Sequence, residues 1–293
     1  MKKKALTIVL AVFLFLFALG LTLYPVISNY VNSKYASEIH TAYEEIIAEA
    51  DNSALVAALD AAIAYNDAIR PGSTFAESYS QEAIRAASEN YEAQLNISGS
   101  GIMGYVEIPK IGVNLPIYHG TGNDSLDRGV GHLLGSSLPV GGESTHAILT
   151  GHSGMATQKM FTDLELLEIG DVFYIDVLNE TLAYQVEAIN VVEPHDTSLL
   201  GIEHGRDICT LITCTPYGIN SHRLLVCGSR IAYEEATVIE EATAEEPEVQ
   251  STWENQYIKG IVYGILIVIL IVVIFAVISA IRRSMQEGGH FER

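Results

Sequence analysis

The sequence predicts a mainly β domain that is preceded by helices and flanked by two apolar segments. Between residues 101 and 233, short runs rich in β-branched residues alternate with Gly, Pro and Asn. Residues 34–100 instead show apolar positions at helical spacing, and residues 5–33 and 258–281 are strongly apolar. Many short strands separated by turns are typical of a β-sandwich or a β-barrel.

The two apolar segments predict a two-pass membrane protein. Residues 5–33 carry no charge and follow three lysines, and residues 258–281, uncharged from position 260, precede two arginines. Each segment is long enough for a bilayer core, and positive flanks stay on the cytoplasmic side. We therefore expect a cytoplasmic stub at 1–4, a cytoplasmic tail at 282–293 and an external domain between the spans. A cleaved signal peptide is the alternative for the first span, although its apolar run is longer than usual.

Residues 34–100 are expected to form a helical hairpin outside the membrane. Helical spacing runs from Ser37 to about Ile69, and a Pro-Gly pair then interrupts it. A second helix is expected to begin at Ser80, which can serve as an N-cap. One more helix-like segment, 161–170, interrupts the β-rich region.

The net charge of −20 narrows the possible partners. Much of the acidic excess lies in residues 234–257, a segment whose composition is typical of a solvated linker. Binding to nucleic acid requires a basic face, so we expect no nucleic-acid partner.

Cys214 and Arg223 suggest a reactive site. Cys214 closes one β-rich run, a turn-like segment follows, and Arg223 begins the next run. If the two runs pair as a hairpin, these residues lie opposite each other. A planar fork of N–H donors beside a thiolate can hold a substrate carbonyl, or the oxyanion formed when sulfur attacks it. This pattern indicates acyl transfer, whereas an ordinary surface arginine and a buried thiol are the alternatives.

A cysteine nucleophile needs a group that takes its proton, and histidine is the usual partner. Among nine histidines, His152 is favoured because it follows a strand-like run directly and lies in a loop between glycines. Loops held by rigid strands often carry catalytic groups. The pattern alone leaves other histidines open, namely His119, His132, His146, His195 and His204.

The other two of the three cysteines are expected to be unlinked. With Cys214 opposite Arg223, Cys209 faces Gly228 and lies on the opposite face of the sheet from Cys227. A disulfide needs Cβ atoms about 3.5–4.5 Å apart, so we expect two small core residues instead. A β-bulge would shift the register and permit the bond. No cysteine has metal-ligand spacing, so no metal or cofactor is expected.

These residues match a known family. The stretch TLITCTPYGINSHRLLVCGSR (210–230) resembles the Thr-Leu-x-Thr-Cys…Arg signature of sortases, and LTGHSGM resembles the stretch with their catalytic histidine. GYVEIPKIGVNLPIYHGT and GVGHLLGSSLPVGGESTHAILTGH are similar to the class C, pilin-polymerising branch. The likeness extends over about 37–233.

The resemblance implies a sortase-type closed β-barrel of about eight strands at residues 101–233. It also implies a cysteine transpeptidase that cleaves a Leu-Pro-x-Thr-Gly-like sorting signal. Cys214 would be the nucleophile, His152 the acid/base, and Arg223 the stabiliser of substrate or oxyanion. The implied partners are pilin subunits with an acceptor lysine, at the membrane of Gram-positive bacteria.

Class C sortases usually carry a lid with an Asp-Pro-aromatic motif over the site. The corresponding stretch here, 71–79, contains Glu77-Ser78-Tyr79, which keeps the acid and the aromatic residue and lacks the proline. The resemblance implies a lid formed by Glu77 and Tyr79, and an ordinary interhelical loop is the alternative. A papain-like cysteine hydrolase and a non-enzymatic surface binding module are the competing functions.

Overall fold

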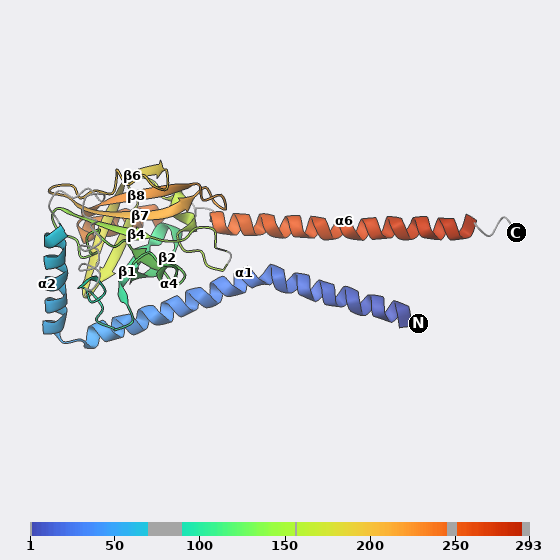
Figure 1. Ribbon diagram of the computed structural model, residues 1–293, viewed down its shortest axis with the longest axis horizontal. Coiled ribbons are helices and arrows are strands. Elements are labelled where there is room, and N and C mark those ends of the chain that lie inside the picture. The colour runs from blue at the N-terminus through green and yellow to red at the C-terminus, as the bar shows by residue number, and fades with distance from the viewer. Residues whose placement is uncertain (1, 70–89, 156, 245–250, 289–293) are drawn as a thin grey trace. The chain divides into compact units, whose positions relative to one another are not determined.

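The computed structural model describes residues 2–69, 90–155, 157–244 and 251–288 (Figure 1). They fall into two compact units that divide between residues 249 and 250. The first unit holds the N-terminal helices, the β-rich region and one following helix. The described part of the second unit is one long helix.

The β-rich region forms a closed barrel of eight strands in the order β1-β2-β3-β4-β7-β8-β6-β5. Two neighbouring pairs, β2–β3 and β4–β7, are parallel, and the others are antiparallel. The prediction of a mainly β fold with about eight strands is confirmed. The strands are β1 (Ile102–Ile108), β2 (Val113–His119), β3 (Val130–His132), β4 (Thr145–Thr150), β5 (Val172–Val177), β6 (Glu180–Val192), β7 (Asp207–Thr215) and β8 (His222–Ile231).

One face of each strand fills the interior of the barrel. Along β7, Cys209 and Leu211 belong to the main core, whereas Ile212 joins a separate apolar cluster. Side chains alternate between the two faces of a strand, so Cys209 and Leu211 point inward and Ile212 points outward. Cys214, two residues further along, therefore lies on the outer face, near the end of β7.

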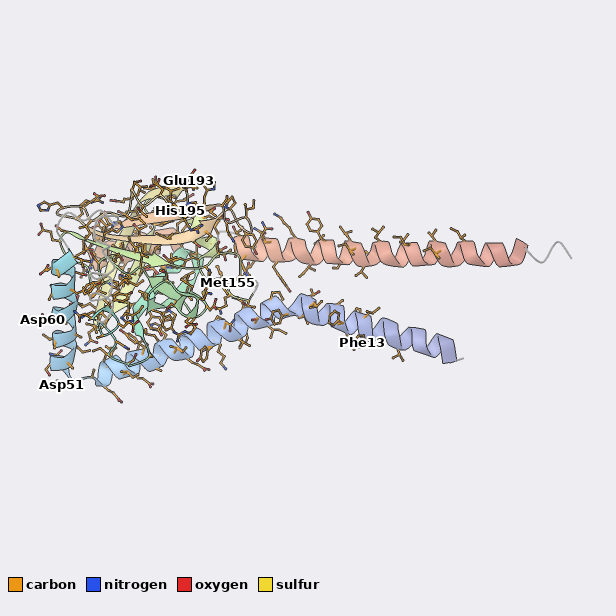
Figure 2. The ribbon with its side chains drawn as sticks, viewed as in Figure 1. Phe13, Asp51, Asp60, Met155, Glu193 and His195 are labelled. Atoms are coloured by element: carbon orange, nitrogen blue, oxygen red, sulfur yellow. The ribbon has the colours of Figure 1, made fainter. Side chains whose placement is uncertain are left out.

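The N-terminal part of the first unit consists of α1 (Lys2–Glu49) and α2 (Asn52–Ile69). The expectation of one helix over 37–69 is wrong, because the chain turns between these two helices. Asp51 lies at this turn (Figure 2), where its carboxylate accepts a hydrogen bond of 3.1 Å from the backbone N–H of Ser53. A side-chain acceptor just before a helix starts that helix, and here it separates α2 from α1.

The last turns of α1 pack on the barrel through an apolar cluster. Tyr43 and Ile47 of α1 are buried against Ile102, Tyr105 and Tyr118 of the first two strands. Burial raises the pKa of Tyr43 to about 12, so this hydroxyl stays protonated. The second helix of the predicted hairpin, from Ser80 on, lies mostly outside the described residues.

Short helical elements connect several strands. They are η1 (Pro109–Ile111), α4 (Asn123–Leu126) and η2 (Thr162–Leu166). The helix-like segment predicted at 161–170 is therefore a 3-10 helix of five residues. Of these elements, α4 connects β2 to β3, and η2 follows the loop after β4.

The acidic segment after the barrel begins with a helix, α5 (Tyr233–Ala244). The expectation of a solvated linker is wrong for these residues. Ala236 is fully buried against Val172, Tyr174 and Ala183, and the hydroxyl of Tyr174 donates a hydrogen bond of 2.7 Å to Glu240. One apolar stripe thus docks α5 on β5 and β6, and Glu240 adds a polar contact, while Glu234, Glu235 and Glu241 are exposed.

The described residues contain one helical stretch, Phe13–Glu49 of α1, that is long and apolar enough to cross a membrane. Its place near the N-terminus fits a signal sequence as well. The second predicted span falls within α6 (Thr252–Gly288). Two membrane crossings remain a prediction.

We expect Gly228→Ala to destabilise the barrel. A Cβ at position 228 would lie 2.5 Å from Cε1 of Phe173 and 3.1 Å from Cβ of Tyr184. Overpacking of this kind costs about 1–3 kcal/mol of unfolding free energy. Thermal unfolding of the full-length chain measures the loss. Gly201→Ala is the matched control, since nothing lies within 4 Å of its added Cβ. Equal melting temperatures for the two variants would contradict the packing argument.

Candidate active site

The β7–β8 hairpin places a thiol opposite a guanidinium. Cys214 pairs directly with Arg223, and Cys209 pairs with Gly228, which confirms the predicted register. The Arg223 side chain folds toward its own loop, where Nη1 donates hydrogen bonds to the carbonyl oxygens of His222 (3.1 Å) and Asn220 (3.4 Å). The loop backbone therefore orients the guanidinium at this end of the hairpin.

Cys214 borders a small depression at the end of the β7–β8 hairpin. Cys214 is half-buried, and the depression is also lined by Ser153, Thr162, Tyr217 and Leu224. The depression has no room for a water molecule, and the half-buried Cys214 is held among these neighbours.

His152 reaches the same end of β7 through a parallel strand pair. Strand β4 pairs with β7 as far as Thr150 and Ile212, and the N–H of Gly151 then bonds to the carbonyl of Ile212 at 3.0 Å. Beyond His152, the hydroxyl of Ser153 donates to the carbonyl of Cys214 at 2.6 Å. The chain on both sides of His152 is thus bonded to the end of β7.

The tight packing of this loop explains the glycine before His152. A Cβ at Gly151 would lie 2.6 Å from the ring of Phe161. The backbone N–H of Phe161 also bonds to the carbonyl of His152 at 3.0 Å. Phe161 therefore packs against the loop and holds the backbone of His152 in place.

Asp127 contacts the imidazole from the other side. Its carboxylate Oδ1 lies 3.8 Å from Nε2 of His152, and its side chain is 64% exposed. Asp127 follows α4, in the connection from β2 to β3. Sequence reasoning did not select this residue, because an exposed aspartate after a short helix has no distinguishing pattern. The tertiary structure alone brings it to His152.

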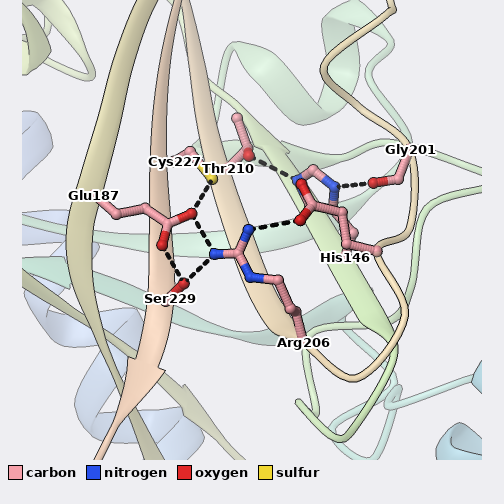
Figure 3. A network of polar contacts seen from close by, with 8 residues as sticks. His146, Glu187, Gly201, Arg206, Thr210, Cys227 and Ser229 are labelled. Atoms are coloured by element: carbon pink, nitrogen blue, oxygen red, sulfur yellow. Dashed lines mark hydrogen bonds and ion pairs between the residues drawn. The ribbon is translucent and has the colours of Figure 1, made fainter.

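Two of the rival histidines are occupied elsewhere. His132 is fully buried, its ring nitrogens bond to Tyr91 (2.8 Å) and Ser137 (2.8 Å), and burial lowers its pKa to about 4. His146 bonds to Gly201 (2.8 Å) and Thr210 (2.7 Å), as Figure 3 shows, and burial lowers its pKa as well. Both rings are held as neutral structural groups.

The remaining rivals are bonded elsewhere or exposed, and one of them, His195, follows Val192, which pairs with Arg223 at the strand end of Cys214. His119 bonds through its ring to the carbonyls of Gln94 (2.8 Å) and Gly101 (3.1 Å). His195, in the connection after β6 (Figure 2), and His204 both lie in exposed loop positions. Among the candidates, geometry favours His152.

Cys209 and Cys227 are free thiols, as expected, but Cys227 is not a core residue. It lies half-buried on the outer face, where its Sγ donates to Glu187 at 3.8 Å, beside Ser229 and Arg206 (Figure 3). Burial raises the pKa of Cys227 to about 11, and burial raises that of Cys209 well above its ordinary value. Both thiols therefore stay protonated at neutral pH.

Two further predictions concern the lid over the site and the binding of a metal ion. The lid residues Glu77 and Tyr79 lie outside the described residues. Within the part of the chain that the structure describes, no group of three or more His, Cys, Asp or Glu side chains is placed to hold a metal ion.

A closed barrel with a thiol, an imidazole and a guanidinium at one strand end defines a thiol-dependent acyl-transfer type of enzyme. Comparison with known proteins identifies the family. The sortase domain model matches residues 106–231. A crystal structure of sortase C1 from Streptococcus agalactiae is 42% identical, with a TM-score of 0.62, and the match covers 67% of this chain and 98% of that one. The chain belongs to the sortase family of cysteine transpeptidases.

Further structures place the chain with class C sortases. Streptococcus pneumoniae sortase C is 41% identical with a TM-score of 0.58, and the match covers 67% of this chain and 97% of that chain. Sortase C-1 from Actinomyces oris is 45% identical with a TM-score of 0.55, and the match covers 61% of this chain and 99% of that chain.

Curated relatives match over a shorter part. Sortase D of Bacillus subtilis is 32% identical over 131 residues, which is 44% of this chain and 63% of that protein. The chain therefore spans slightly less than two thirds of the length of this relative.

We expect thiol reagents to label Cys214 selectively at neutral pH. The thiolate is the nucleophile, and raised pKa values keep Cys209 and Cys227 protonated. Labelling of Cys227 by iodoacetamide should rise steeply only as the pH approaches about 11. Peptide mapping by mass spectrometry measures each site, and Cys214→Ala is the control. Equal labelling of Cys227 and Cys214 at neutral pH would show that the environment of Cys227 is misjudged.

Proposed function

We propose that this chain is a class C sortase that joins pilin subunits through a thioacyl intermediate on Cys214. The proposal rests on one observation. Cys214 pairs with Arg223 at the end of β7, and the chain on both sides of His152 is hydrogen-bonded to the same strand end. Family membership supports transpeptidation as the reaction. A papain-like hydrolase would give Arg223 no special role.

The reaction has two halves. The Cys214 thiolate attacks the threonine carbonyl of a Leu-Pro-x-Thr-Gly-like signal, the Thr–Gly bond breaks, and His152 gives a proton to the leaving glycine amine. Neutral His152 then takes a proton from a lysine ammonium, and the amine attacks the thioester carbonyl. An isopeptide bond forms, the C–S bond breaks, and a second proton passes from nitrogen to the departing sulfur.

Arg223 would stabilise the negative charge that develops in each half of the reaction. Attack on a carbonyl places negative charge on its oxygen, and donors that are already oriented toward it stabilise that charge most effectively. The loop carbonyls of Asn220 and His222 hold the guanidinium by one nitrogen. A planar fork offers further N–H groups to the substrate, which a lysine ammonium cannot reproduce.

The similarity to class C sortases also suggests the partners of this chain. The crystal structure of Streptococcus pneumoniae sortase C was described as giving insight into the pilin substrate specificity of that enzyme. For this chain we propose pilins with a sorting signal and an acceptor lysine as substrates. Residues 5–33 and the segment 258–281 would anchor the enzyme in the membrane, with both termini cytoplasmic.

The lid is part of this proposal. A structure of Corynebacterium diphtheriae sortase A is that of a lid mutant, so a lid exists in that similar protein. In this chain Glu77 would bond to Arg223 and Tyr79 would cover Cys214, since charge-assisted hydrogen bonds and sulfur–aromatic contacts are favourable. Serine stands at position 78 where the lid motif has proline, so closing costs more entropy and this lid should open readily.

The lid is tested by the rate at which a thiol reagent alkylates Cys214. Glu77→Ala combined with Tyr79→Ala should speed alkylation, because nothing then covers the thiol. Asp60→Ala, at an exposed position of α2 (Figure 2), is a control that should leave the rate as in the wild type. An unchanged rate in the double variant means that 71–79 does not gate the site.

Three substitutions test the catalytic set. Cys214→Ala should abolish transpeptidation of a pilin, because no other group forms the thioester. His152→Ala should lower it by about 10²–10⁴-fold, the usual contribution of a positioned proton-transfer group. Arg223→Lys should also fail badly. The ladder of pilin products on a denaturing gel gives the readout, and full polymerisation by Arg223→Lys would remove the role assigned to this arginine.

A further inference from the structure

A groove in the first unit is lined in part by Asp127. It has a volume of about 670 Å³ and runs between α1 and β2, with Asn32 and Tyr35 on one side and Leu115 and Pro116 on the other. The depression beside Cys214 shares no lining residue with it. A transpeptidase takes two substrates, and in this chain the groove is separate from the thiol of Cys214.

Cys214 and the Asp127 groove are reached through different neighbours of the strand that leads to His152. Strand β4, which leads into His152, has β7 as one neighbour and β3 as the other. Cys214 lies at the end of β7, whereas Asp127 lies in the connection that leads into β3. A donor bound beside Cys214 and an acceptor bound beside Asp127 would thus reach the imidazole from different directions.

The carboxylate of Asp127 is available to a cation. It is 64% exposed, and its ion pair with His152, at 3.8 Å, is the one recorded for it among the described residues. Such a pair exists when His152 is protonated. After His152 has given its proton to the leaving amine it is neutral, and a second cation can then take its place beside the carboxylate.

Neighbouring cations in the groove are engaged elsewhere. The ammonium of Lys159 lies 2.8 Å from Asp163 and 2.7 Å from the carbonyl of Ile111. The guanidinium of Arg128 stacks 4.2 Å from the ring centroid of Tyr118. Both cations line the wall of the groove. The exposed carboxylate of Asp127 therefore remains available beside His152.

We propose that Asp127 binds the ammonium of the acceptor lysine, and that the groove between α1 and β2 holds the protein segment that carries this lysine. This inference rests on the proposed transpeptidase function. The ammonium would lie beside Nε2, the nitrogen that faces Asp127. It gives one proton to neutral His152, and the amine attacks the Cys214 thioester. The C–N bond forms, the C–S bond breaks, and the second proton passes from nitrogen to the thiolate.

The test is a competition between two acceptors on the same thioacyl enzyme. The full-length chain in detergent receives a Leu-Pro-x-Thr-Gly peptide together with Nα-acetyl-lysine amide and hydroxylamine. Hydroxylamine is uncharged at neutral pH and needs no carboxylate, so the ratio of the two products isolates recognition of the ammonium from the rate of acylation. Asp127→Asn should lower the lysine-to-hydroxylamine ratio about 5-fold, which corresponds to roughly 1 kcal/mol for an exposed ion pair.

Two variants serve as controls for charge. Asp127→Glu keeps the carboxylate and should hold the ratio within about 2-fold of the wild type, as a change much smaller than 1 kcal/mol. Asp124→Asn, in the short helix α4 that precedes Asp127 and exposed like it, should give the wild-type ratio. An unchanged ratio in Asp127→Asn overturns the inference while the proposed function stands. Failure of the wild type to form either product overturns the proposed function, and the inference with it.

A second arm tests the groove. Ala36 lines it from α1, and Ala36→Trp should narrow it. The variant should use a lysine-bearing pilin segment several-fold less well while it uses Nα-acetyl-lysine amide as the wild type does. Equal use of the pilin segment by both enzymes places the acceptor protein elsewhere and overturns this part of the inference.

Discussion

Backbone pairing at the two edges of β7 is the constraint on which the site depends. On one edge, antiparallel pairing with β8 sets Arg223 opposite Cys214. On the other edge, parallel pairing with β4 brings the chain beyond Thr150 to the same strand end. A slip of one residue would turn each of these side chains to the other face of the sheet. The candidate groups are thus placed by hydrogen-bond ladders that extend through the whole barrel.

The parallel pair also explains the polar network on the outer face of the barrel. Parallel strands are usually covered on both faces, and here the connection from β6 to β7 covers the outside of β4 and β7. Leu200 of this connection packs in the outer apolar cluster, and the carbonyl of Gly201 bonds to His146, which bonds in turn to Thr210 of β7. A fully bonded buried histidine therefore supports the strand that carries Cys214, without taking part in chemistry.

Several features were not predictable because they depend on surfaces that form only on folding. Composition pointed to a solvated segment after the barrel, yet Ala236 finds an apolar site on β5 and β6 and α5 docks there. The turn at Asp51, with its capping hydrogen bond to Ser53, lies within a long helical pattern that gives no sign of it. The residues next to Asp127 in the sequence form no recognisable motif, and only the contact with His152 draws attention to it.

The sequence by itself determined the β-hairpin of the site, because Cys214 and Arg223 are nine positions apart and strand alternation decides which side chains share a face. The same local rule excluded a bond between Cys209 and Cys227. Only the tertiary structure decided which histidine joins them. The bond from Thr213 to the carbonyl of Gly151 joins residues 62 positions apart. Parallel pairing over such a distance leaves no periodic mark in the chain, since it depends on how the barrel closes.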